Sequence, residues 1–160
     1  MTDQAATHEV SADEQLLAVA IEQAEIGLRE GGIPIGAVLA VDGKVLGAGH
    51  NRRVQMNSAI RHGETDALEH AGRLPASTYA QATMYTTLSP CHMCTGANLL
   101  YGIRRVVIGE NRTFMGAEDL LRAHGVEVIN LDSERCYELM TNFIAAHPTL
   151  WLEDIGEIGA

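Results

Sequence analysis

Lysine is nearly missing from this sequence of 160 residues, in which Lys44 is the single example. The 11 basic residues are outnumbered by 21 acidic ones, and the formal net charge is −10. Proteins that bind long nucleic acids neutralise phosphates with clusters of lysine and arginine. The charge therefore disfavours a nucleic-acid partner, whereas a small neutral molecule is compatible with it.

Long apolar runs are also missing. No segment approaches the roughly 18 consecutive apolar residues of a membrane-spanning helix. The polar stretch 1–9 lacks the basic-then-apolar order of a signal peptide. We therefore expect a cytoplasmic protein with no membrane partner.

Cysteine is scarce, and the sequence contains only Cys91, Cys94 and Cys136. An odd, low number without a secretion signal argues against a disulfide framework. We expect Cys136 to be a small, buried core residue. Cys91 and Cys94 form a C-x-x-C pair, which in a cytosolic protein indicates metal or redox chemistry.

The spacing of apolar residues predicts alternating helices and strands. Ser11 and Glu14 form a capping box at the start of a helix that ends at Gly31-Gly32. Asp42-Gly43, between two apolar segments, is typical of a two-residue hairpin turn. Further helices are expected at 62–71, 90–101, 117–124 and from 133 to just before Pro148, and strands at 35–41, 44–48, 82–88, 104–109 and 126–131.

This order of elements predicts the α/β class. The two strands of the hairpin must be antiparallel, whereas strands joined by helices should be parallel with right-handed crossovers. Because the sequence has no internal repeat or linker, residues 1–160 are expected to form a single domain. The predicted architecture is a three-layer α/β/α sandwich around a five-stranded mixed sheet.

Two short motifs carry the chemical information. His62-Gly63-Glu64 precedes one predicted helix, and Pro90-Cys91-His92-Met93-Cys94 opens another. Two thiolates three residues apart share one helix face, and together with an imidazole they suit Zn²⁺ and leave its fourth position open. His-x-Glu followed by Pro-Cys-x-x-Cys is the pattern of zinc deaminases, in which the glutamate moves protons and is not a ligand. The sequence thus predicts Zn²⁺ held by His62, Cys91 and Cys94, with Glu64 as the catalytic acid and base.

Other interpretations of the C-x-x-C pair stay open. It could be a redox pair or half of a structural zinc site, although such a site would want a fourth Cys or His at compact spacing. A thioredoxin-like motif would leave His62 and Glu64 unexplained. A non-catalytic, zinc-bound scaffold is a further alternative, against which the presence of Glu64 speaks.

Along nearly its whole length, the sequence resembles the fungal-type cytosine deaminases of the cytidine deaminase superfamily. The resemblance lies in the stretches Glu30-Gly31-Gly32-Ile33-Pro34-Ile35-Gly36, Gly49-His50-Asn51, His62-Gly63-Glu64, Tyr85-Thr86-Thr87-Leu88-Ser89-Pro90-Cys91 and Trp151-Leu152-Glu153-Asp154-Ile155-Gly156-Glu157. The last stretch is the most specific, because nothing in zinc chemistry demands it. It contains the only tryptophan, so we expect this segment to fold back over the site as a lid.

The resemblance implies polar contacts to a flat, nitrogen-containing ring. Asn51 and the backbone N–H of Gly63 would bind the ring carbonyl. Asp154 would bind a ring N–H, and the carbonyl of Ser89 would bind the leaving amine.

The resemblance also implies an apolar enclosure for the ring. Phe114 and Trp151 would cover it, beside Ile33 and Leu88. Val54 stands where the fungal enzymes have a bulkier phenylalanine, which predicts a wider pocket.

The implied reaction is the zinc-dependent, hydrolytic deamination of a free nucleobase, with cytosine as the leading substrate. Creatinine, isocytosine or a guanine-like base are the nearest alternatives. A nucleoside or a tRNA is disfavoured by the acidity of the chain and by a lid that would close over a sugar. The resemblance further implies a homodimer.

Overall fold

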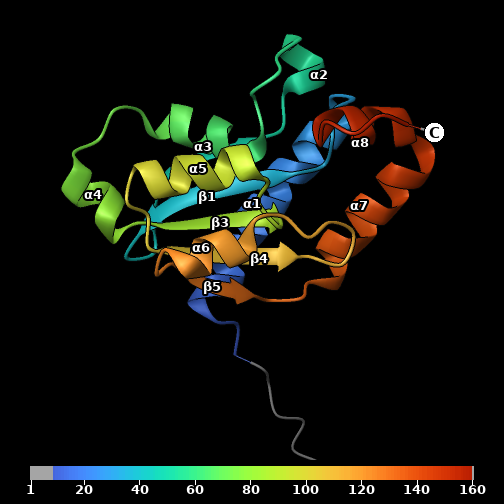
Figure 1. The fold of residues 1–160 in the computed structure, drawn as a ribbon. Helices are drawn as coiled ribbons and strands as arrows, with labels where there is room; N and C mark the ends of the chain where they lie inside the picture. Colours follow the sequence, from blue (N-terminus) through green and yellow to red (C-terminus); the bar gives the residue numbers. More distant parts are fainter. Residues whose placement is uncertain (1–8, 160) are drawn as a thin grey trace, which may run out of the picture.

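The computed structural model describes residues 9–159, and these form three layers (Figure 1). The middle layer is a five-stranded sheet in the order β2-β1-β3-β4-β5. The strands are β1 (Gly36–Val41), β2 (Lys44–His50), β3 (Thr83–Leu88), β4 (Arg105–Glu110) and β5 (Glu127–Asn130). β1 is antiparallel to β2 and β3, whereas β3, β4 and β5 are parallel. The predicted α/β class and mixed sheet are confirmed.

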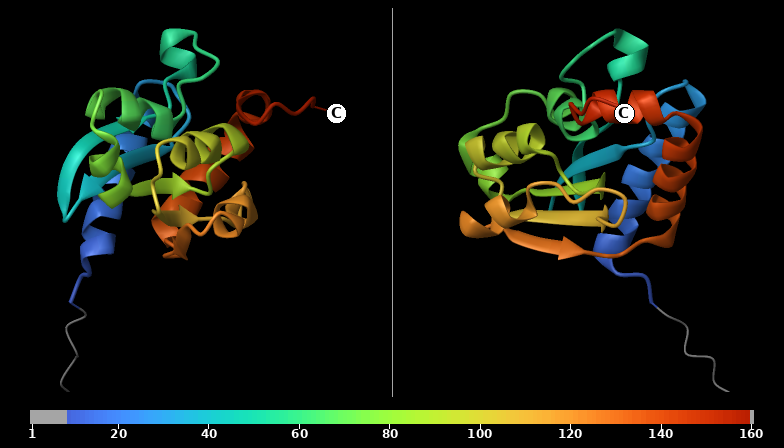
Figure 2. Two further views of the ribbon diagram at one scale, coloured as in Figure 1. Left: turned by 60° about the vertical axis from the view of Figure 1, so that its left-hand side comes forward. Right: turned by 45° about the vertical axis from the view of Figure 1, so that its right-hand side comes forward.

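Helices cover both faces of the sheet (Figure 2). α1 (Ala12–Arg29) and α7 (Glu134–Ala146) pack on one face, where Leu17 of α1 and Cys136 of α7 join a buried cluster with Val38 and Val107. The opposite face carries α3 (Gly63–Ala71), α4 (Ala76–Gln81), α5 (His92–Leu100) and α6 (Glu118–Ala123). Cys136 is therefore a buried core residue, as predicted.

The first helix begins as the sequence predicts. Ser11 is the N-cap of α1, and the reciprocal hydrogen bonds of the capping box with Glu14 are present. The helix then packs closely against β1, because Gly36 has no side chain. A Cβ atom at Gly36 would lie 1.9 Å from the carbonyl oxygen of Ala20, so a larger residue would force the two elements apart.

The hairpin between β1 and β2 has the predicted two-residue turn. Asp42 and Gly43 both have positive φ values, 49° and 77°. Hairpin turns of two residues need this conformation because it matches the twist of the strands. The turn therefore fixes where β2 begins, and the antiparallel pairing follows.

Three short helices were not predicted from the sequence. They are α2 (Arg53–Met56), α4 and α8 (Pro148–Asp154). Each has four to seven residues, fewer than the two turns needed to show a helical spacing of apolar residues. The loop expected at 51–61 and the lid expected at 151–157 are therefore partly helical.

The other element boundaries agree with the predictions to within about two residues. α5 begins at His92 rather than at Pro90, because Cys91 is its N-cap. Within the described range, no helix has the length and apolar character that a membrane crossing requires. Most of the polar stretch 1–9 lies outside the described residues.

Candidate active site

The predicted metal ligands meet at the beginnings of two helices. His62 is the N-cap of α3, Cys91 is the N-cap of α5, and Cys94 lies in the first turn of α5. One ligand atom from each residue lies within 4.8 Å of the others, and Nδ1 of His62 is 3.5 Å from Sγ of Cys91. Because positive helix N-termini stabilise thiolates, the start of α5 favours the charged form of Cys91, its N-cap.

The two cysteines have opposite acidities. A hydrogen bond from Cys94, with a further one from His62, lowers the pKa of Cys91 to about 4 although burial opposes the shift. The same Cys91–Cys94 hydrogen bond, together with burial, raises the pKa of Cys94. Burial also opposes the charging of His62, but Cys91 and the carboxylate of Asp154 raise its pKa to about 9. Cys91 is thus the acidic thiol of the cluster, and both Cys94 and His62 form hydrogen bonds with it.

The donor set fits a zinc ion. Tetrahedral zinc with Zn–S bonds near 2.3 Å and Zn–N bonds near 2.0 Å separates sulfur from nitrogen by about 3.6 Å, close to the observed distance between Cys91 and His62. Two sulfurs and one nitrogen are the ligands that zinc prefers, and three protein ligands leave one position for catalysis. Within residues 9–159, this is the group of His, Cys, Asp and Glu side chains that could hold a metal ion.

Glu64 lies beside this cluster as a deeply buried carboxylic acid. It belongs to the first turn of α3 and is 4% exposed. The hydroxyl of Thr86 on β3 donates to its Oε1 over 3.1 Å. Burial raises the pKa of Glu64, and the charge of Cys91 adds to the shift. A carboxyl group in such a place exchanges protons more readily near neutral pH than an exposed one does.

A small cavity of about 20 Å³ is lined by Glu64 and Cys91, and we call it the inner cavity. Its volume suffices for about one water molecule, so a ring enters only when surrounding side chains move apart. The lining residues are Ile35, His62, Glu64, Leu88, Ser89, Cys91, Phe114, Trp151, Asp154 and Ile155.

Two aromatic side chains close one side of the inner cavity. Phe114 and Trp151 meet edge to face, with ring centroids 5.6 Å apart. Trp151 is 6% exposed and comes from α8, so the C-terminal stretch folds back as expected. Ile33 does not line the cavity directly but belongs to the same buried apolar cluster as Leu88 and Trp151.

Some of the residues that were predicted to make polar contacts with the ring also contact each other. Nδ2 of Asn51 donates to Oδ1 of Asp154 over 2.7 Å, although 103 residues separate the two in the chain. Nε2 of His62 lies 3.4 Å from the same oxygen, and an arginine nitrogen of Arg53 lies 3.7 Å from it. Gly63 is the first residue of α3, where backbone N–H groups lack a partner within the helix.

Some residues of the site were not predicted. Ile35 and Ile155 line the inner cavity, and Thr86 contacts Glu64. Both isoleucines fall inside stretches that the resemblance marks, so their position in those stretches was the available signal. Thr86 also falls in one of these stretches, 85–91, and is a polar residue in a strand that is buried on both faces.

Larger hollows lie outside the inner cavity. One of about 520 Å³ shares His62, Cys91 and Asp154 with it and forms an outer entrance. Val54, which is 42% exposed, does not line the inner cavity; it lines a hollow of about 460 Å³ that shares Arg53 with the entrance. The extra space that Val54 leaves in place of a bulkier side chain therefore lies outside the inner cavity.

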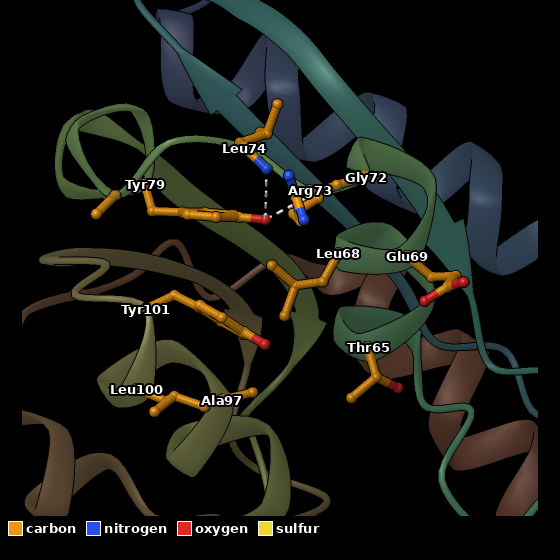
Figure 3. Close-up of a pocket in the computed structure, with 11 residues that line it drawn as sticks. Thr65, Leu68, Glu69, Gly72, Arg73, Leu74, Tyr79, Ala97, Leu100 and Tyr101 are labelled. Atoms are coloured by element: carbon orange, nitrogen blue, oxygen red, sulfur yellow. Dashed lines mark hydrogen bonds between the residues drawn. The ribbon is translucent and has the colours of Figure 1, made fainter.

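A cavity of about 660 Å³ lies apart from the metal-binding cluster, between α3, α4 and α5 (Figure 3). Tyr79 and Tyr101 stack there with centroids 5.0 Å apart, and the hydroxyl of Tyr79 donates to the carbonyl of Gly72. This cavity shares no lining residue with the inner cavity and holds neither of the two sequence motifs. Residues of both motifs therefore line the smaller, inner cavity and not this larger one.

Residues 10–110 match the family described as the cytidine and deoxycytidylate deaminase zinc-binding region. This range contains both motifs, His62 to Glu64 and Pro90 to Cys94. The chain belongs to this family. As a member of the cytidine and deoxycytidylate deaminase family, it is a hydrolytic deaminase with zinc as its cofactor.

Relatives of this deaminase include enzymes with different substrates. A cytosine deaminase from Candida albicans is 58% identical over 146 residues, which are 91% of this chain and 97% of the relative. A tRNA-specific adenosine deaminase from Streptococcus pyogenes is 37% identical over 113 residues, 69% of this chain and 71% of the relative. A solved chain from work on A-to-I editing by tRNA:A34 deaminases matches with a TM-score of 0.66 and 27% identity, covering 78% of this chain and 98% of that one.

Proposed function

We propose that this deaminase acts on free cytosine and converts it to uracil with release of ammonia. The observation that carries the proposal is the buried hydrogen bond between Asn51 and Asp154, because Asp154 lines the inner cavity. The Candida albicans cytosine deaminase supports it, because the similarity covers 91% of this chain and so exceeds the matched family range of residues 10–110.

Asn51 and Asp154 offer a donor and an acceptor side by side. Cytosine presents a carbonyl next to a ring N–H, which is the complementary pattern. The hydrogen bond from Asn51 and the close approaches of His62 and Arg53 all involve Oδ1 of Asp154. Among the described residues, its Oδ2 therefore has no hydrogen bond and can accept from a ring N–H. The N–H of Gly63, at the first position of α3, would add a second donor to the carbonyl.

The substrate ring would lie between apolar walls. Phe114 and Trp151 would cover it on one side, with Ile33 and Leu88 beside them. Flat, neutral rings are well suited to such an enclosure, because aromatic and aliphatic contacts need no charge on the ligand.

His62, Cys91 and Cys94 would hold the zinc ion. When bound, zinc supplies a positive charge that lowers the pKa of a water molecule and so provides a nucleophile near neutral pH. The remaining steps depend on side chains of the protein.

Glu64 would move the protons. It takes one from the attacking water and gives it to the ring nitrogen beside the amine-bearing carbon, while the oxygen forms a bond to that carbon. It next takes the proton of the new hydroxyl group and gives it to the amine. The carbon–nitrogen bond then breaks, a carbonyl forms and ammonia leaves, with the carbonyl of Ser89 as the acceptor for the amine hydrogens.

A substrate panel tests the proposal. Ammonia release should be measured with cytosine, cytidine, isocytosine, creatinine and guanine under one set of conditions. We expect kcat/KM for cytosine to exceed that for cytidine by about 10²-fold or more, because a sugar on the ring nitrogen leaves Asp154 buried without its partner.

Each outcome of the panel has a distinct meaning. A preference for cytidine would contradict recognition of a free base. A preference for isocytosine, creatinine or guanine would keep the reaction type and replace the substrate. A cytoplasmic location, a homodimer and a single domain over residues 1–160 stay predictions, and we include them in the proposal on the basis of sequence resemblance.

A further inference from the structure

The loop 111–117 carries Phe114 over the inner cavity, and a buried glutamate holds each end of it. Glu110, fully buried at the end of β4, accepts from the backbone N–H groups of Arg112 and Thr113 over 2.7 and 3.0 Å. Glu118, 1% exposed, lies at the start of α6. Neither glutamate has a part in the proposed reaction.

Glu118 is surrounded by donors. Its Oε2 accepts from the hydroxyl of Ser89 over 2.7 Å and from Nδ2 of Asn111 over 3.2 Å. Its Oε1 accepts from the guanidinium of Arg122 over 3.3 Å. The shortest of these contacts is the one with Ser89, which lies outside the loop, in the segment that precedes Cys91. Glu118 therefore joins the loop to the inner cavity.

Backbone N–H groups of the loop also form hydrogen bonds with the segment that contains Ser89 and Pro90. The Ser89 hydroxyl oxygen accepts from the N–H of Gly116, and the N–H of Ala117 donates to the carbonyl of Pro90 over 2.9 Å. A Cβ atom at Gly116 would lie 1.9 Å from that carbonyl oxygen, so the two segments touch without room for a side chain. A shift of either segment therefore moves the other.

We propose that Glu118 is a positioning residue that, through the Ser89 hydroxyl, sets the distance between the Phe114 wall and the backbone carbonyl of Ser89. It does not contact the substrate. Its effect on catalysis is to hold the two groups that would enclose the ring and accept its amine. The kinetic part of this inference rests on the proposed function, whereas the geometric part does not.

The single tryptophan gives a direct optical readout of the loop. Trp151 is buried and packs edge to face on Phe114. Glu118→Ala should therefore shift the fluorescence emission of Trp151 to longer wavelength and increase its quenching by acrylamide. Ser89→Ala removes the same link from the other side and should give the same change.

Matched variants separate positioning from general damage. Asp119→Ala removes a neighbouring acidic side chain that is fully exposed in the same helical turn, and it should leave the emission unchanged. Glu118→Gln keeps one acceptor oxygen for the Ser89 hydroxyl and should restore most of the wild-type signal. The double variant Glu118→Ala with Ser89→Ala should be no worse than the more affected single variant, because both changes break one link.

Steady-state kinetics supply the second readout. With the best base from the substrate panel, Glu118→Ala and Ser89→Ala should raise KM about tenfold while kcat stays within about twofold, as expected when binding alone is weakened. Unchanged emission and KM in folded Ser89→Ala would overturn the inference. A loss of thermal stability without either change would also overturn it.

The inference can still be tested if Glu118→Ala does not fold or if the wild-type protein shows no activity. If Glu118→Ala does not fold, Ser89→Ala carries the same two expectations with only one atom removed. If the wild-type protein deaminates none of the bases, the proposed function fails, and the fluorescence comparison still decides whether Glu118 holds the loop.

Discussion

Glu64 combines two properties that are costly to hold together, a carboxyl group and nearly complete burial. Thr86 donates a hydrogen bond to Oε1 of Glu64, and Glu64 also lines the inner cavity, where it can exchange a proton. Glu64→Gln keeps the shape but cannot carry protons. We expect kcat to fall by about 10²-fold or more, while zinc content is retained.

Ammonia release and elemental analysis check this expectation together. Glu69→Gln is the control, since Glu69 is an exposed residue of the same helix. Near-normal turnover of Glu64→Gln would show that another group moves the protons.

The metal ligands give a second prediction at the scale of single residues. Cys94→Ala removes one of three donors, and the purified variant should therefore lose most of the roughly one zinc ion per chain that we expect in the wild type. Cys136→Ala alters a cysteine that is equally buried but lies on the other face of the sheet, so its zinc content should be unchanged. Equal zinc in both variants would contradict the ligand assignment.

The sequence alone was sufficient to predict that the three proposed metal ligands lie together, but not which other distant residues are in contact. His62, Cys91 and Cys94 lie in two short motifs whose spacing has a chemical reason. The contact between Asn51 and Asp154 has no such pattern, because a spacing of 103 residues carries no periodicity. Only the resemblance pointed to both residues, and only the structure places them 2.7 Å apart.

At the scale of elements, one ionic cluster attaches α1 to the sheet. The guanidinium of Arg105 on β4 donates to both carboxylate oxygens of Asp13 over 2.8 and 2.7 Å. The hydroxyl of Tyr85 on β3 donates to the same carboxylate over 2.9 Å. The hydrogen bonds from Arg105 hold the pKa of Asp13 below its ordinary value of 3.8. Burial and the contact with Asp13 raise the pKa of Tyr85 to about 12.

Asp13→Asn should lower the free energy of unfolding by about 1 kcal/mol at pH 7, because a two-oxygen contact with arginine is lost. Because the pKa of Asp13 is lower in the folded state, this contribution is present above pH 3.8 and disappears as the pH falls below it. The difference between wild type and variant should therefore be constant from about pH 5 to 8 and shrink at lower pH.

Urea unfolding of both proteins across this pH range gives the measurement. Glu127→Gln is the control, because Glu127 contacts Arg105 as well but is 63% exposed, and surface ion pairs contribute little. A difference that grows as the pH falls below 4 would contradict the assignment to Asp13.

The long elements were easier to predict than the short ones for a physical reason. α1 has 18 residues, a capping box and a repeated apolar face, and all three signals agree. α8 has seven residues and begins with Pro148, so its position depends on packing against Phe114 and the inner cavity rather than on its own sequence. The hairpin turn is short but was predicted because its two positive φ values require particular residues.

At the scale of the whole molecule, metal and fold stabilise each other. The three proposed ligands come from α3 and α5, which pack on one face of the sheet, so a zinc ion joins two separate elements. An ion that binds only the folded state stabilises it by mass action. At a free concentration of 100 times its Kd, zinc should add about 2.7 kcal/mol to the stability and raise Tm by about 5–10 °C.

Thermal unfolding of the chelated protein, before and after zinc is added back, measures this effect. Cys94→Ala should show a much smaller rise under the same conditions. Identical Tm values for the chelated and reloaded wild type would mean that the ion does not join the two helices.

The separation of Asn51 and Asp154 has a consequence for the protein while it is being made. The ribosome releases α3 and α5, with all proposed zinc ligands, well before it releases α8. A nascent chain can therefore load its metal while the acidic partner of Asn51 is still inside the exit tunnel. On the proposed roles, substrate binding is the last property that the chain acquires, because Asp154 must first leave the tunnel and pack against Asn51.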